Sequence, residues 1–441
     1  MLTRRTMLMK LALGAAGVAS GAVPFRLGNA WSPRPHSFSS SDDSFLNEVS
    51  RASFDLFWEN SHPRTGLVKD VVVPGENAIN AVSSIAATGF GLTALCIGAE
   101  RSWANRAEAL ERVRTSLRFL HNEMPHEHGF FHHFVDWQSG QRAWMSEVSS
   151  IDTAILICGV LTCRQFFQDD EVRELAGKIY DRVDWRWLYQ DGPFMSHGWT
   201  PERGFLLSKW DSYSEHMMLY LLAIGSNTHA IPSESWKAWS RPHFNFAGGN
   251  YIEAAAPIFI HQYSHAWFDF RGQQDAYANY FENSATATRA HRNFCTELSR
   301  EFPTYTENLW GITASESPKG YAVWGGPPKM GPIDGSVVPC AAGGSLPFAP
   351  EMTLQTLRHM RERHAKQSWT RYGFTDAFNP GTGWAARPLI AINTGITLLM
   401  AENARSGFVW ENFMRNRETK TAMQKVGFNT VDDVFKSPIL T

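Results

Sequence analysis

Three acidic residues stand beside strongly apolar sequence and are the first candidates for chemistry. Asp152 and Glu215 each open a long apolar run, and Asp376 lies in an aromatic turn. Apolar surroundings raise the pKa of a carboxylic acid, which is the property that a general acid needs near neutral pH. Two carboxyl groups in different environments across a groove are the minimum equipment for cleaving a glycosidic bond. The three acids therefore indicate general acid–base chemistry.

Each acid also has a purely structural interpretation, which stays open at this point. Ser149 and Asp152 have the spacing of a capping box with Asp in place of Glu, so that Asp152 would only close a helix N-terminus. Glu215 would favour the start of its helix through the helix dipole. Asp376 would form an Asx turn onto Phe378.

A histidine cluster invites a metal interpretation, but its spacing matches no common zinc motif. The cluster comprises His126, His128, His132 and His133, and no C-x-x-C pair accompanies it. We expect these histidines to form loop hydrogen bonds or to contact a substrate hydroxyl, and we predict no metal. We also predict no nucleotide cofactor, because no glycine-rich phosphate motif is present. The absence of a G-x-S-x-G elbow argues against a serine triad.

The composition excludes several classes of protein. The 441 residues include 41 basic and 43 acidic side chains, and a formal net charge of −2 lacks the basic excess of a nucleic-acid-binding protein. A chain of this length can bury a large core. The aromatic content is high, with 17 Trp, 29 Phe and 11 Tyr. Trp offers a flat apolar face with one donor, which suits either sugar binding or a large helical core.

The N-terminus has the pattern of a twin-arginine export signal. Arg4 and Arg5 precede a weakly apolar stretch rich in Gly and Ala, which is too short for a comfortable transmembrane helix. We therefore expect a signal peptide over residues 1–30, export to the periplasm and no stable membrane insertion after cleavage. An uncleaved membrane anchor is the alternative. A polar linker is expected over residues 31–42, followed by one catalytic domain over 43–441.

The chain has five cysteines, an odd number, and two of them lie in an apolar helix-like run. We interpret them as buried thiols rather than as a disulfide framework. They are Cys96, Cys158, Cys163, Cys295 and Cys340.

The elements that must position the acids are predominantly helical. Apolar residues recur at helical spacing from Phe45 to Leu56 and in nine further stretches. Some stretches are amphipathic, whereas others are apolar all round and must be buried on all sides. The stretches are 83–101, 104–122, 150–168, 170–187, 211–224, 273–298, 350–365, 388–404 and 407–416. This pattern predicts two concentric layers of helices, an (α/α) barrel, with long loops that form a groove at one end.

Sequence blocks along nearly the whole chain resemble one known family. The resemblance to the glycoamylase-like family of bacterial glycoside hydrolases, which includes the endo-β-1,2-glucanases, extends from about residue 45 to residue 415. The blocks include 54–60, 65–70, 128–134, 226–232, 262–271, 307–321, 372–379 and 402–410. The resemblance implies an all-α (α/α)6 barrel, a glucan-binding cleft and location in the periplasm.

The resemblance also implies an inverting hydrolysis. Glu215 matches the family's general acid and Asp376 its base, which activates water directly or through an intervening hydroxyl. The sequence departs from the family where a D-L-V-E-T segment reads Ser149-Ser-Ile-Asp152-Thr. Glu147, five residues upstream of Asp152, is a candidate to take over part of the missing acid's work.

Further side chains in matched or adjacent loops are expected to bind glucose units. They are His133, Tyr263, His265, Trp310, Glu316 and Trp384. The sequence therefore predicts a monomeric periplasmic hydrolase whose partner is a glucan, most simply β-1,2-glucan or its oligosaccharides. Two alternatives stay open. One is an exo-acting oligosaccharide hydrolase or a transglycosylase on another linkage, and the other is a carbohydrate-binding protein that has lost turnover.

Overall fold

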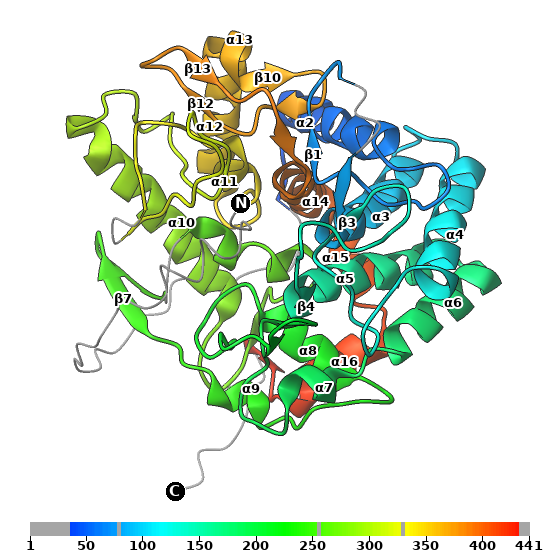
Figure 1. Ribbon diagram of the computed structural model, residues 1–441. Coiled ribbons are helices and arrows are strands. Elements are labelled where there is room, and N and C mark those ends of the chain that lie inside the picture. The colour runs from blue at the N-terminus through cyan, green and yellow to red at the C-terminus, as the bar shows by residue number, and fades with distance from the viewer. Residues whose placement is uncertain (1–35, 77–80, 254–256, 328–330, 432–441) are drawn as a thin grey trace, which may run out of the picture.

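The structure is a computed structural model that describes residues 36–76, 81–253, 257–327 and 331–431. Within these ranges, long helices alternate with loops, and the strands contain two to four residues each. The helices form an inner and an outer ring (Figure 1). The predicted (α/α)6 barrel is confirmed. The expected signal peptide lies outside the described residues.

The inner ring consists of segments that are apolar on all sides. Every residue of α8 is buried, and in α3 every residue except Glu100 is buried. The ring follows the order α3 (Ile85–Glu100), α5 (Ser150–Phe166), α8 (Met217–Gly225), the 3-10 turns η1 (Ile258–His261) and η2 (Ser264–Ala266), α11 (Pro339–Gly343) and α14 (Ala391–Ser406). Since α14 packs against both α3 and α11, the ring closes.

The outer ring consists of amphipathic helices that bury one face on the inner ring. The outer helices are α2 (Ser40–Glu59), α4 (Arg106–Asn122), α6 (Asp170–Asp181), α10 (Tyr280–Glu297), α12 (Pro350–Arg363) and α16 (Arg417–Lys425). In Figure 1, α2 covers α14 and α3, α6 covers α5, and α16 covers α8. No helix among the described residues combines the length and the apolar character that a membrane span requires.

The remaining elements are short. The helical ones are α7 (Trp185–Tyr189), α9 (Ser235–Ala238), α13 (Ala365–Ser368), α15 (Phe408–Phe413) and η3 (Leu298–Arg300). The strands are β1 (Val71–Val72), β2 (Val82–Ser84), β3 (Phe134–Asp136), β4 (Val148–Ser149), β5 (Gly198–Thr200), β6 (Gly204–Phe205), β7 (His243–Phe246), β8 (Gly249–Ile252), β9 (Gln273–Gln274), β10 (Trp369–Thr370), β11 (Gly373–Phe374), β12 (Phe378–Asn379), β13 (Trp384–Ala385), β14 (Leu389–Ile390) and β15 (Asn429–Thr430). All named strands pair antiparallel, for example β1 with β14, β2 with β3, and β4 with β5.

Two glycines allow the inner helices α3 and α5 to pack closely. A Cβ atom on Gly159 would lie 2.2 Å from the carbonyl oxygen of Gly89, and a Cβ atom on Gly89 would lie 2.4 Å from that of Ile155. Real Cβ contacts of this length do not occur, so neither position accepts a side chain without a shift of backbone. The five cysteines are all buried and free, as predicted.

The helix boundaries differ from the sequence-based ones in three informative places. Residues 170–187 form two helices, because α6 ends at Asp181 and α7 begins at Trp185. The expected helix at 211–224 starts only at Met217, so that Glu215 lies in the turn before it. Helix α2 starts at Ser40, inside the expected linker, where the Ser39 side chain caps it.

Candidate active site

The candidate active site is a pocket at the N-terminal ends of the inner helices. Strands β2, β4 and β14 end directly before α3, α5 and α14, and their last residues contribute to this end of the barrel. The pocket is small and partly open to solvent. Its polar lining residues are Asp70, Ser84, His133, Asp152, Glu215, Tyr263, Tyr321 and Asn393. Helix N-termini carry partial positive charge, which stabilises carboxylates placed there.

His133 lies between two carboxylates in the wall of this pocket. Its Nδ1 atom is 3.1 Å from Glu147 Oε1, and its Nε2 atom is 3.7 Å from Asp152 Oδ2. All three side chains are at most 10% exposed. The backbone N–H of His133 also donates to the carbonyl of Glu147, at 2.8 Å, which fixes the two strand ends against each other. Glu147 therefore orients the imidazole from the side away from Asp152, and does not itself line the pocket.

The same three side chains form a donor set that could hold a metal ion. Among the described residues, one ligand atom from each of His133, Glu147 and Asp152 lies within 4.8 Å of the others. The other clustered histidines make different contacts. His128 stacks on Trp187 with a centroid separation of 4.5 Å, and the Gly129 N–H donates to His126 Nδ1. These local contacts agree with the loop role expected for them.

Asp152 combines the two interpretations that the sequence left open. Ser149 is the N-cap of α5, and its hydroxyl accepts from the Asp152 N–H at 3.3 Å and donates to Asp152 Oδ2 at 2.5 Å. Only the N-cap half of a capping box forms, because the Ser149 backbone N–H donates to the Phe131 carbonyl, at 3.0 Å, and not to Asp152. The Asp152 side chain also lines the pocket. The helix cap thus holds a carboxylate in place at the site rather than competing with a role there.

Glu215 is positioned by the turn that starts α8. The Ser264 hydroxyl of η2 donates to the Glu215 carbonyl at 2.6 Å and accepts from the Met218 N–H at 3.0 Å. The Ser214 hydroxyl contacts the Glu215 carboxylate. The Glu215 side chain is buried and lines the pocket at the positive end of α8.

Asp376 lies behind the main pocket rather than in it. Its Oδ2 atom accepts from the Glu316 N–H at 2.7 Å, and its Oδ1 atom accepts from Asn393 Nδ2 at 2.9 Å. It lines a smaller neighbouring cavity, and Asn393 lines both cavities. The expected Asx turn onto Phe378 is wrong, because the Phe378 N–H donates to the Val337 carbonyl instead, at 2.9 Å.

The expected sugar contacts divide into three groups. Tyr263, like His133, lines the pocket. Glu316 contributes its backbone N–H to Asp376, and Trp384 lies half-buried on β13 outside the lining, so their contact with sugar stays a prediction.

The expectations for His265 and Trp310 require correction. Both side chains are fully buried in the core. His265 packs edge-on against Phe270 and Phe348, and burial lowers its pKa to about 3. Trp310 packs beside His291. The large aromatic content of the loops thus serves packing as well as the pocket, and sequence alone cannot separate the two uses.

Four polar residues of the pocket were not among the expected site residues: Asp70, Ser84, Tyr321 and Asn393. Asp70 is an acid directly before the apolar run 71–73, a signal of the same kind that identified Asp152. Its backbone is fixed by bonds of 2.9 Å to Val82 and Ala391. Nothing in the local sequence distinguishes Asn393 or Tyr321, because the ring closure alone brings them to the pocket.

Comparison with known proteins finds a matching family model and a similar curated protein. Residues 208–417 match the family model Glycoamylase, described as "Putative glucoamylase". An exo β-1,2-glucooligosaccharide sophorohydrolase (non-reducing end) from Parabacteroides distasonis is 27% identical, over 87% of this chain and 58% of that protein. The chain thus spans less than two thirds of the length of this curated relative.

Solved structures of similar proteins cover nearly the whole barrel. An endo-β-1,2-glucanase from Chitinophaga pinensis, in complex with sophorotriose and glucose, superposes with a TM-score of 0.80 at 27% identity, over 89% of this chain and 99% of that one. A β-1,2-glucanase from Parabacteroides distasonis gives a TM-score of 0.82 at 26% identity, over 89% and 61%. Together with the shared barrel, these matches show that the chain is similar to proteins of the glycoamylase-like family over most of its length.

Proposed function

We propose that the protein hydrolyses β-1,2-linked glucan or its oligosaccharides. The observation that carries the proposal is the pocket at the N-terminal ends of the inner helices, where Asp70, Asp152 and Glu215 bring three carboxyl groups together. Relatives with the same barrel are named as enzymes that act on β-1,2-glucan or β-1,2-glucooligosaccharides.

Glu215 is the general acid of this proposal, and Asp376 the base. Glu215 gives its proton to the glycosidic oxygen as the C–O bond breaks, and water attacks the anomeric carbon from the opposite face, with inversion. The proton lost by that water ends on Asp376. Because Asp376 lies in the cavity behind Asn393, we expect an intervening hydroxyl to relay this proton. Solvent exchange then restores both carboxyl groups.

His133, in the wall of the pocket, also supports the proposed function. Glu147 holds the imidazole through Nδ1, at 3.1 Å, so the orientation of the ring is set before substrate enters, and Nε2 lies 3.7 Å from Asp152 Oδ2. A preorganised donor of this kind can bind a substrate hydroxyl without reorganisation cost. Asp152, held by Ser149, falls where the D-L-V-E-T pattern of the resemblance has Glu, and we propose that it serves the same substrate.

Exo action on oligosaccharides is the second candidate. It is favoured by the name of the Parabacteroides distasonis relative. Endo action is favoured by the name of the Chitinophaga pinensis structure. We further propose that the enzyme works in the periplasm, on the pattern of residues 1–30.

The test is a comparison of glucans. Residues 31–441 are incubated with β-1,2-glucan, starch, β-1,3-glucan and cellulose, with Glu215→Gln as the blank. A ladder of products from β-1,2-glucan alone supports endo action, and a single small product supports exo action. Product anomers measured by NMR distinguish inversion from retention. Binding of glucan without product from any of the four polymers would contradict hydrolysis and leave a carbohydrate-binding protein.

A further inference from the structure

The loop between β3 and β4 exposes an aromatic side chain beside the pocket. Trp144 is 63% exposed, and the neighbouring Met145 is 70% exposed. Both have left-handed backbone, with φ of 52° and 53°. A bulky residue rarely adopts this conformation, and it persists only where the surroundings impose it. The surroundings of Trp144 therefore hold a large apolar ring out into solvent.

Arg142 and the edge of β3 impose this conformation. Arg142 Nε donates to the Ser146 carbonyl at 2.6 Å, and Arg142 Nη2 donates to the Met145 carbonyl at 2.7 Å. The same guanidinium makes a bidentate pair with Glu202, at 2.6 and 3.0 Å. Ala143 N–H donates to the Phe134 carbonyl at 2.9 Å. The loop is thus tied to the neighbouring β5–β6 turn and to β3 at once.

The exposed ring is continuous with the pocket wall. Trp144 contacts Phe134 with a centroid separation of 5.2 Å, and Phe134 stacks on His133 at 3.8 Å and 18°. His133 lines the pocket. The three rings form a series from the pocket wall out to solvent. Trp144 is thus separated from a residue of the pocket wall by a single buried ring, that of Phe134.

We propose that Trp144 forms an outer sugar-binding subsite, on which the C–H face of a glucose unit stacks when a longer glucan extends from the pocket. This inference rests on the proposed function, because the ligand of the subsite is a further part of the same glucan chain. An indole provides the flat apolar face that a pyranose ring needs, and burial of that face by sugar removes exposed apolar surface from water. The subsite makes affinity depend on chain length.

The experiment compares substrates of different length in matched variants. Trp144→Ala is expected to raise KM about 10-fold on long β-1,2-glucan, equivalent to about 1.4 kcal/mol, with kcat retained. The shortest oligosaccharide that the wild type cleaves is expected to show no change. Trp144→Phe keeps a flat ring and should recover most of the affinity. Tyr277→Ala is the control, because Tyr277 is also exposed, at 44%, but packs under Arg241.

A binding measurement separates this inference from the proposed function. Long β-1,2-glucan is titrated into Glu215→Gln and into Glu215→Gln with Trp144→Ala, by calorimetry, after equal Tm values have shown that both fold. Weaker binding in the double variant supports the subsite even if the wild type cleaves nothing. Equal affinity of the two variants for long glucan overturns the proposed subsite. The subsite is also overturned if the wild type has the same KM on long and on short substrates. Self-association of the wild type that Trp144→Ala abolishes would instead assign the ring to an interface between two copies.

Discussion

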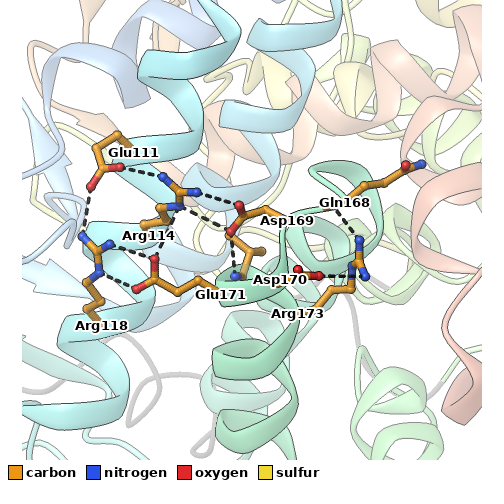
Figure 2. Close-up of polar contacts among 9 residues, drawn as sticks. Glu111, Arg114, Arg118, Gln168, Asp169, Asp170, Glu171 and Arg173 are labelled. Atoms are coloured by element: carbon orange, nitrogen blue, oxygen red, sulfur yellow. Dashed lines mark hydrogen bonds and ion pairs between the residues drawn. The ribbon is translucent and has the colours of Figure 1, made fainter.

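Two clusters of charged and titratable side chains in this barrel use the same residue types in opposite ways. At the pocket, His133, Glu147 and Asp152 are at most 10% exposed. Between the outer helices α4 and α6, arginines and carboxylates form a network in which Arg118 is 44% exposed and Glu171 is 39% exposed. Figure 2 shows this outer network, which extends from α4 to the first turn of α6.

The outer network is built from bidentate pairs. Arg118 meets Glu171 at 2.6 and 2.8 Å, and Arg114 meets Asp169 at 2.6 and 3.3 Å. Glu111 bridges the two arginines. Hydrogen bonds to the arginines hold the pKa values of Asp169 and Glu171 below their usual range. Water screens such exposed pairs, so each contributes little to stability.

The difference teaches that burial, not charge density, separates the reactive cluster from the structural one. Buried carboxylates need several donors or a helix N-terminus to remain in place, and those constraints fix their geometry. Exposed carboxylates can form short ion pairs without these constraints, because water solvates any oxygen that lacks a protein donor. We therefore expect large effects from single substitutions at the pocket and small effects at the α4–α6 surface.

The largest expected effect follows removal of the proposed acid. Glu215→Gln keeps the size of the side chain and removes the proton donor, so kcat should fall by about 1,000-fold, within the range for general acid catalysis. The Tm should stay close to that of the wild type. Reducing-end assays on β-1,2-glucan measure kcat, and calorimetry measures Tm. Full activity of Glu215→Gln would remove this residue from the mechanism.

A loss of about 100-fold in kcat is expected for Asp376→Asn. The amide can accept from only one of the two donors, Glu316 N–H and Asn393 Nδ2, that the carboxylate oxygens accept from now. We therefore also expect a lower Tm, in contrast to Glu215→Gln. The kcat is measured well below the Tm of both proteins. A variant with reduced Tm but unchanged kcat would show that Asp376 only supports the fold.

Acidification is expected to destabilise the buried region through two histidines. Burial lowers the pKa of His265 and of His291 to about 3. The unfolded chain binds protons at these positions below about pH 6.5, and the folded chain does not. Stability contributed above pH 6.5 is therefore lost as pH falls toward 3, by up to about 1.4 kcal/mol per pH unit for each histidine.

Urea unfolding at pH 7, 6 and 5 measures this loss. Constant stability from pH 7 to pH 5 would contradict the assignment of both buried histidines as neutral.

The smallest effect is expected at the outer network. Arg118→Ala removes one bidentate pair with Glu171 and one contact with Glu111. The Tm should fall by no more than about 2 °C, and kcat should not change. Because salt screens exposed pairs, the difference should shrink in 0.5 M NaCl. A drop as large as that of Asp376→Asn would erase the distinction between the two clusters.

Much of the fold could be predicted from local sequence. Runs that are apolar on all sides, such as residues 151–163, predict the inner helices, and striped runs predict the outer ones. The start of a helix can also be predicted from a few neighbouring residues, as for Ser149 and Asp152 at the start of α5. The 3-10 turns of the inner ring escaped prediction, because they are too short to show a period.

The candidate site was predictable only in part. Asp152, Glu215, His133 and Tyr263 were expected and lie in one pocket. Buried aromatic residues could not be told from sugar-binding ones, since a Trp in a loop has the same local sequence in either role, and Trp310 proved to be core.

The sequence by itself determined which segments form helices, which of these are buried, and which acids stand in apolar surroundings. Periodicity, capping residues and composition act over a few residues, so they can be interpreted without the fold. Only the tertiary structure decided that Asp376 lies behind Asn393, that Glu147 and Asp152 lie at the two ring nitrogens of His133, and that Asp70 joins them. These relations depend on the closure of the inner ring, which brings together residues far apart in the chain.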